Sequence, residues 1–158
     1  MRTIPLLILI ATACRAPLSR AEGAFGIWNM NVARSTFTGD AQPKGLTVRI
    51  EPHTKGEVFT LDKVGGDNRA TTSSTILYFD GKSRDFQDLG CSGTQSSRRV
   101  DSRTVEVLRK CANGEWTRLV RRSAAQPKEL ILEITEQHPD GRRFERRLVL
   151  EKQQEARP

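Results

Sequence analysis

The 158-residue chain has few of the side chains on which catalytic and metal centres depend. It contains two histidines and three cysteines, and aromatic residues make up 6% of it. His53 and His138 each lie beside a proline in a predicted turn, and no H-x-x-x-H or C-x-x-C spacing for a zinc site occurs. The run Gly-Cys-Ser-Gly at residues 90–93 lacks the G-x-S-x-G frame of a serine nucleophile. The sequence therefore predicts a non-enzymatic protein without a metal site, cofactor or catalytic residue, and with both histidines exposed in loops.

A long apolar run is missing as well, and the apolar block near the N-terminus is too short to cross a membrane. It covers residues 4–14 and follows Arg2, whereas a spanning helix needs about 20 apolar residues. A short apolar block after a basic residue, followed by small residues, is typical of a signal peptide. The sequence predicts that residues 1–21 are cleaved off between Ala21 and Glu22, and that the protein is periplasmic or secreted.

An alternative interpretation of the same segment leads to a membrane anchor. Residues 11–14 are Ala-Thr-Ala-Cys, which loosely resembles the lipobox of bacterial lipoproteins. Cleavage before Cys14 would leave that cysteine as a lipid-bearing first residue, and the lipid would tether the protein to a membrane. Membrane contact is expected only in this case.

The other two cysteines are expected to form a disulfide. Removal of the signal segment leaves Cys91 and Cys111 in the folded part, and an even pair in an exported chain is most simply a disulfide. The bond would close a loop of about 20 residues and contribute roughly 3 kcal/mol in the chain-entropy model. Two buried free thiols are the alternative.

Basic residues are unevenly distributed along the chain. Removal of residues 1–21 takes away three arginines and no acidic residue, which lowers the net charge from +7 to +4. This surplus is weak evidence for nucleic-acid binding, so no nucleic-acid partner is predicted. Residues 98–147 nevertheless hold 13 basic against 8 acidic residues, with four adjacent arginine pairs. Because neighbours on a strand point to opposite faces, one arginine of each pair would face solvent, either salt-bridged or in contact with an anionic partner.

Short runs rich in Val, Ile, Thr, Phe and Leu alternate with charged residues and turn signals across residues 22–152, which is typical of a single all-β domain. Ten strands are expected, at 25–32, 45–52, 57–64, 74–79, 84–90, 94–100, 104–111, 115–122, 129–137 and 142–152. Asp-Gly and Asn-Gly pairs predict tight hairpins, at 80–81, 113–114 and 140–141. Residues 33–42 suit a short helical turn or a loop, and residues 153–158 a flexible tail. The pattern predicts an antiparallel meander that closes into a barrel, with a β-sandwich as the alternative.

Residues 26–37 carry a family resemblance. They are Gly-Ile-Trp-Asn-Met-Asn-Val-Ala-Arg-Ser-Thr-Phe, which resembles the opening G-x-W-x-L-N-x-A-K-S-x-F of small secreted bacterial proteins described as lipocalin-like, most of unknown function. The resemblance implies a calycin-type barrel. In true lipocalins, which share the G-x-W part, this Trp closes one end of the barrel and a late arginine packs across it. By that resemblance Trp28 would be the plug, with Arg146 over its ring, although Met30 and Arg34 depart from the usual Leu and Lys.

A hollow barrel would hold a ligand against inward-facing aromatic residues. The candidates for lining such a pocket are Phe59, Tyr78, Trp116 and Phe144. The function predicted first is therefore the binding of a small apolar or amphipathic ligand inside the barrel. The alternative is a barrel filled by side chains, in an envelope-associated protein whose arginine-rich surface contacts an anionic polymer or a protein partner.

Overall fold

The computed structural model describes residues 24–39, 42–88, 90–124 and 128–154. The predicted signal peptide with its cleavage site at Ala21, Cys14, and residues 155–158 of the predicted tail lie outside these ranges. Within the described residues, no helix has the length and apolar character needed to cross a membrane.

Eleven strands and one short 3-10 helix make up the described part of the chain. The first half contains β1 (Gly26–Met30), the 3-10 helix η2 (Val32–Arg34), β2 (Thr36–Thr38), β3 (Gly45–His53), β4 (Gly56–Val64) and β5 (Ala70–Leu77). The second half contains β6 (Arg84–Asp88), β7 (Cys91–Arg99), β8 (Thr104–Cys111), β9 (Trp116–Ser123), β10 (Glu129–Gln137) and β11 (Arg143–Lys152).

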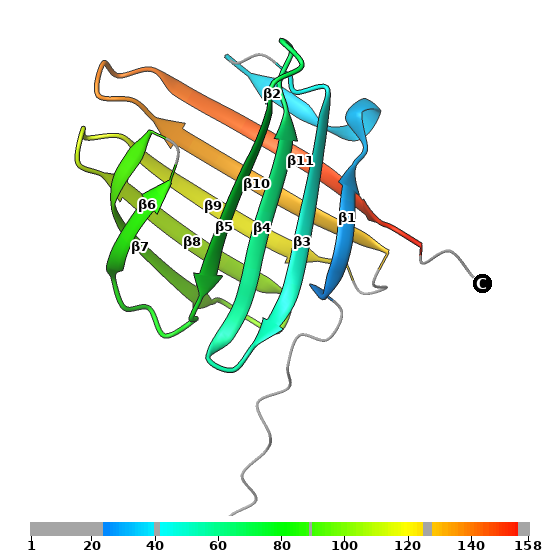
Figure 1. The fold of residues 1–158 in the computed structure, drawn as a ribbon, viewed down its shortest axis with the longest axis horizontal. Coiled ribbons are helices and arrows are strands. Elements are labelled where there is room, and N and C mark those ends of the chain that lie inside the picture. Colours follow the sequence, from blue (N-terminus) through cyan, green and yellow to red (C-terminus); the bar gives the residue numbers. More distant parts are fainter. Residues whose placement is uncertain (1–23, 40–41, 89, 125–127, 155–158) are drawn as a thin grey trace, which may run out of the picture.

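The strands form one antiparallel sheet that curls into a barrel (Figure 1). Neighbouring strands follow the order β5-β4-β3-β1-β11-β10-β9-β8-β7-β6, and β2 pairs with β11. The beginning and the end of the chain are joined, because β1 pairs with both β3 and β11. The all-β barrel predicted from the sequence is confirmed, in preference to the sandwich.

The core fills the inner face of the barrel, where strand alternation points the apolar residues inward. On β10 and β11, the inward-facing Leu130, Leu132, Leu148 and Leu150 are all fully buried, as the alternation of the last two strands predicts. Trp28 on β1 belongs to the same core.

The segment after β1 contains more structure than expected. The expected helical turn is η2, which is capped by the Asn31 side chain as it accepts the N–H of Arg34 at 3.2 Å. The additional strand β2 follows it and pairs with β11, and the nearby Ser35 hydroxyl accepts the N–H of Val149 at 3.0 Å. A three-residue strand is too short to show a recognisable alternation in the sequence.

The predicted meander is interrupted between β5 and β6, which are the two edges of the sheet. No backbone ladder joins them within the described strands, so the Asp80-Gly81 pair does not form the expected hairpin. Asp80 forms an isolated bridge with Arg98 of β7 instead. We call the gap between β5 and the β6–β7 hairpin the seam, and side chains close it through Ser73 with Asp88 and Thr75 with Gln95.

The hairpins divide between the two ends of the barrel. One end, which we call the Glu57 end, carries the β3–β4, β7–β8 and β9–β10 connections. The other, which we call the disulfide end, carries the β4–β5, β6–β7, β8–β9 and β10–β11 connections.

Candidate functional site

Trp28 is fully buried on the first strand. Its indole N–H donates to the carbonyl of Ala24 at 2.9 Å, and the ammonium of Lys152 lies 5.5 Å from the ring centre. The cation that the structure places over this ring is therefore Lys152, where the lipocalin resemblance implied Arg146. Arg146 lies farther along β11 and donates to the carboxylate of Glu136 at 2.8 Å.

A buried ion pair lies at the Glu57 end. Arg121 donates from both terminal nitrogens to the carboxylate of Glu57, in one case at 3.1 Å, and both side chains are at most 2% exposed. Arg99 stands nearby, its guanidinium 4.3 Å from the centre of the Phe79 ring. Burial lowers the pKa of Arg99, and Glu57 offsets part of that effect. Because breaking a buried pair leaves an uncompensated charge, separation of Arg121 from Glu57 is costly.

A small cavity lies in the interior between the two ends. Its volume is about 30 Å³, which is room for roughly two water molecules. The lining consists of Phe59, Leu77, Val107, Arg109, Thr117 and Leu119. Four of these side chains are apolar and Arg109 is the charged one, so the cavity is an apolar space with a cation at its edge.

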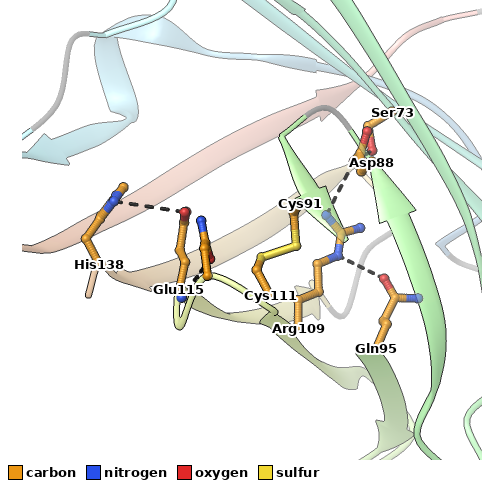
Figure 2. The surroundings of a disulfide bond; sticks show 9 residues. Ser73, Asp88, Cys91, Gln95, Arg109, Cys111, Glu115 and His138 are labelled. Carbon is orange, nitrogen blue, oxygen red and sulfur yellow. Dashed lines mark hydrogen bonds and ion pairs between the residues drawn. A yellow bond between two sulfur atoms is a disulfide. The ribbon is translucent and has the colours of Figure 1, made fainter. Parts of the chain in front are cut away.

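Arg109 connects this cavity to the disulfide end and to the seam. Its Nε donates to the Gln95 Oε1 at 2.8 Å, and its guanidinium lies 4.4 Å from the centre of the Phe86 ring. A terminal nitrogen is 3.8 Å from the Asp88 carboxylate, which also accepts the hydroxyl of Ser73. Figure 2 shows Arg109 between Asp88 and Gln95. Burial lowers the pKa of Arg109, although Asp88 opposes the shift.

The disulfide expected between Cys91 and Cys111 is present beside Arg109 (Figure 2). It links the first residue of β7 to the last residue of β8. Next to it, a Cβ at position 93 would come within 1.9 Å of the carbonyl oxygen of Lys110. Glycine is therefore required at Gly93 by the close approach of the two strands.

A larger groove of about 190 Å³ lies at the seam. Its polar lining includes Tyr78, Lys82, Arg84, Asp85, Gln95 and Ser97. The Arg84 guanidinium lies 4.1 Å from the centre of the Tyr78 ring and donates two hydrogen bonds to Asp80, at 2.6 and 2.8 Å. These bonds hold the pKa of Asp80 well below its usual range. We call this space the seam groove.

The four aromatic residues predicted to line a pocket lie in different places. Phe59 lines the interior cavity, and Tyr78 lines the seam groove. Trp116 and Phe144 line neither of them. Because Thr117 points into the interior, strand alternation places Trp116 on the outer face.

Both histidines are half-buried, which corrects the expectation that they are exposed in loops. His138 packs edge-on against Phe144, with ring centres 5.0 Å apart, and lies 4.0 Å from the Glu115 carboxylate. His53 accepts the N–H of Lys55 at 3.2 Å. In the described part of the chain, no three His, Cys, Asp or Glu side chains are grouped so that they could hold a metal ion.

The outer face carries arginines that are mostly ion-paired. Along one line across five strands, the residues in register are Arg98, Glu106, Val120, Glu133 and Arg147. Arg98 and Arg118 both donate to Glu106, at 2.6 and 2.7 Å, and Arg122 donates to Glu133. Three arginines thus bind two glutamates on this face. We call these five residues, together with Arg147, the outer arginine row.

Four interior residues, Glu57, Gln95, Arg109 and Arg121, were not predicted from the sequence. A signal for the two arginines was present in the alternation, because Arg109 follows Val105 and Val107 on the same face of β8. Arg121 likewise shares a face with Leu119. A charge on an otherwise apolar face requires a partner inside the barrel, and Glu57 is that partner for Arg121.

Comparison with known proteins supports the fold and not a family. No family model matches this chain, and no curated protein matches it. A solved fatty acid binding protein from Schistosoma mansoni, in complex with arachidonic acid, superposes with a TM-score of 0.54 at 10% identity, over 85% of this chain and 98% of that one. A zebrafish ileal bile acid-binding protein, complexed with cholic acid, gives a TM-score of 0.50 at 13% identity, over 85% of this chain and all of that one. At such low identity the likeness shows that the barrel fold is shared.

Proposed function

We propose that this protein is an exported, non-enzymatic binding protein that takes up a small amphipathic molecule in its barrel. The observation that carries the proposal is the interior cavity, where apolar side chains meet the guanidinium of Arg109. An apolar space with a few convergent polar groups is the usual form of a small-molecule site. The complexes of the two solved barrels with arachidonic acid and cholic acid support the same function.

Ligand uptake requires movement of side chains, because about 30 Å³ is far smaller than a drug-sized ligand needs,. Among the residues that line the cavity, Arg109, Thr117 and Leu119 are half-buried, and we expect these three side chains to move. Their displacement would enlarge the cavity toward the disulfide end, whereas the Glu57–Arg121 pair keeps the opposite end shut.

A pair of matched substitutions tests this function. Leu119→Trp fills the interior cavity, and Leu108→Trp adds the same side chain on the outer face of the neighbouring strand, where Leu108 is exposed. Titration with a fluorescent fatty-acid analogue is expected to show saturable binding to the wild type and to Leu108→Trp, and at least tenfold weaker binding to Leu119→Trp. Absence of saturable binding to the wild type would refute the proposal.

The export part of the proposal is supported by the predicted signal peptide and by the disulfide between Cys91 and Cys111,. The intact mass of the mature protein tests it. Cleavage between Ala21 and Glu22 gives a chain that begins at Glu22, a lipid-modified chain that begins at Cys14 shows a membrane anchor, and an uncleaved chain contradicts export.

A second function is supported by the outer arginine row, where three arginines bind two glutamates. Such a surface would contact an anionic polymer or an acidic protein of the envelope. Binding to immobilised heparin should then weaken steeply with added salt. Loss of that binding in Arg98→Gln/Arg118→Gln would assign it to this row, and retention of salt-independent binding would exclude it.

A further inference from the structure

The seam is the single break in backbone pairing around the barrel wall formed by the described strands. Across it, Gln95 donates to the Thr75 hydroxyl at 2.9 Å, and its amide oxygen accepts the Nε–H of Arg109 at 2.8 Å. These are contacts between side chains. They can therefore open by rotamer changes, which are far faster than the separation of paired strands.

Gln95 and Arg109 form the partition between two spaces. Gln95 lines the seam groove, Arg109 lines the interior cavity, and the hydrogen bond between them crosses from one space to the other. Rotation of these two side chains would join about 190 Å³ of polar groove to the apolar cavity of about 30 Å³.

The chemistry of the seam groove favours a headgroup with hydroxyls and no net charge. Its charged groups balance, since Lys82 and Arg84 are offset by Asp85 and by Asp80, which is bound to Arg84. The hydroxyl of Tyr78 makes no hydrogen bond to a described residue. Its ring is held by the Arg84 guanidinium on one face. Such a group is ready to bond to a ligand without rearrangement.

We propose that the seam groove and the interior cavity form one composite site, in which the groove binds an uncharged, hydroxyl-bearing headgroup and the cavity binds the apolar chain attached to it. This proposal rests on the proposed ligand-binding function. It adds the route, through the seam, and the class of ligand, an acyl chain esterified to a polyol.

The test compares ligands that share one acyl chain and differ in the headgroup: the glycerol monoester, the methyl ester and the free acid. Displacement of a fluorescent acyl probe is expected to show that the glycerol ester binds about tenfold more tightly than the methyl ester. Tyr78→Phe should reduce the affinity for the glycerol ester about three- to tenfold, as expected for one hydrogen bond, with the methyl ester unaffected. Thr135→Val, which removes a hydroxyl from the outer surface groove between β2 and β10, is the control.

A second variant tests the route. Gln95→Met keeps the length of the side chain and removes both hydrogen bonds of the partition. Stopped-flow mixing should show association and dissociation rates raised about tenfold together, with a smaller change in their ratio.

The outcomes separate this proposal from the proposed function. Equal affinity for the three headgroups, a preference for the free acid, or unchanged rates in Gln95→Met would overturn the composite site while the barrel still binds an acyl chain. Failure of every acyl ligand to bind the wild type would overturn the proposed function, and the composite site with it.

Discussion

The two ends of the barrel interior hold arginine in opposite ways. At the Glu57 end, Arg121 is almost completely buried and bound by both terminal nitrogens to one carboxylate. At the disulfide end, the Arg109 side chain is 25% exposed and divides its contacts among Asp88, Gln95 and the Phe86 ring. The first arrangement directs both hydrogen bonds of a buried guanidinium to a single carboxylate, whereas the second divides the contacts of a partly exposed guanidinium among three groups.

This difference explains how one barrel can be stable and still admit a ligand. A buried pair is costly to break because the remaining charge is left in a medium of low dielectric constant. A partly exposed arginine regains water when it moves, so its displacement costs little. The Glu57 end thus serves stability, and the disulfide end and seam supply the movable side chains.

The largest expected effect comes from Arg121→Met. This change removes both hydrogen bonds that Arg121 donates to the buried Glu57 carboxylate, so the free energy of unfolding should fall by about 3–5 kcal/mol. Urea denaturation followed by tryptophan fluorescence measures it. The double variant Arg121→Met/Glu57→Leu should regain most of the loss, and Arg122→Met, whose partner Glu133 is half-exposed, should cost less than about 1 kcal/mol. Equal losses in Arg121→Met and Arg122→Met would contradict the contrast between buried and exposed pairs.

The disulfide is expected to have the next largest effect. Cys91→Ser/Cys111→Ser removes the cross-link between β7 and β8 and should lower the free energy of unfolding by roughly 3 kcal/mol, because the unfolded chain gains freedom. Urea denaturation without reductant checks this. Dithiothreitol should produce the same loss in the wild type and none in the variant, and identical stability of the two proteins would show that the bond does not constrain the unfolded chain.

The sequence was sufficient for the barrel and insufficient for the site. Alternation and turn residues located ten of the eleven strands, each of which has at least five residues, whereas the three-residue β2 is too short to show an alternation. The hairpin predicted at Asp80-Gly81 was wrong. A turn dipeptide indicates that the chain reverses direction, but it does not indicate which strand the following segment pairs with. The sequence could not predict which residues pair with the charged side chains that point into the barrel, such as Glu57 with Arg121. They lie 64 residues apart, and their proximity depends on how the sheet closes.

Arg109→Met is the matched substitution at the disulfide end, and we expect it to change the free energy of unfolding by about 1 kcal/mol or less. Asp88 keeps the hydroxyl of Ser73, and the methionine fills apolar volume beside Phe86. The same urea experiment measures it beside Arg121→Met. A loss as large as that of Arg121→Met would show that both ends are structural and would remove the physical basis for ligand uptake at this end.

The smallest expected effect is the pH dependence of stability that arises from Glu106 in the outer arginine row. Burial tends to raise the pKa of Glu106, but the hydrogen bonds from Arg118 and Arg98 outweigh it, so the pKa lies below its ordinary value of 4.5. A carboxyl whose pKa is lowered on folding stabilises the protein above its unfolded pKa, and the contribution disappears as the pH falls through the folded pKa.

Glu106→Gln should therefore cost about 1 kcal/mol at pH 7, and the difference from the wild type should shrink steadily below pH 4.5. Urea denaturation at pH 7, 4 and 3 measures it, with Thr135→Val as a control whose effect should not depend on pH. A difference that stays constant across this range would mean that Glu106 contributes packing and not charge, and that the outer pairs resemble neither of the two interior arginines.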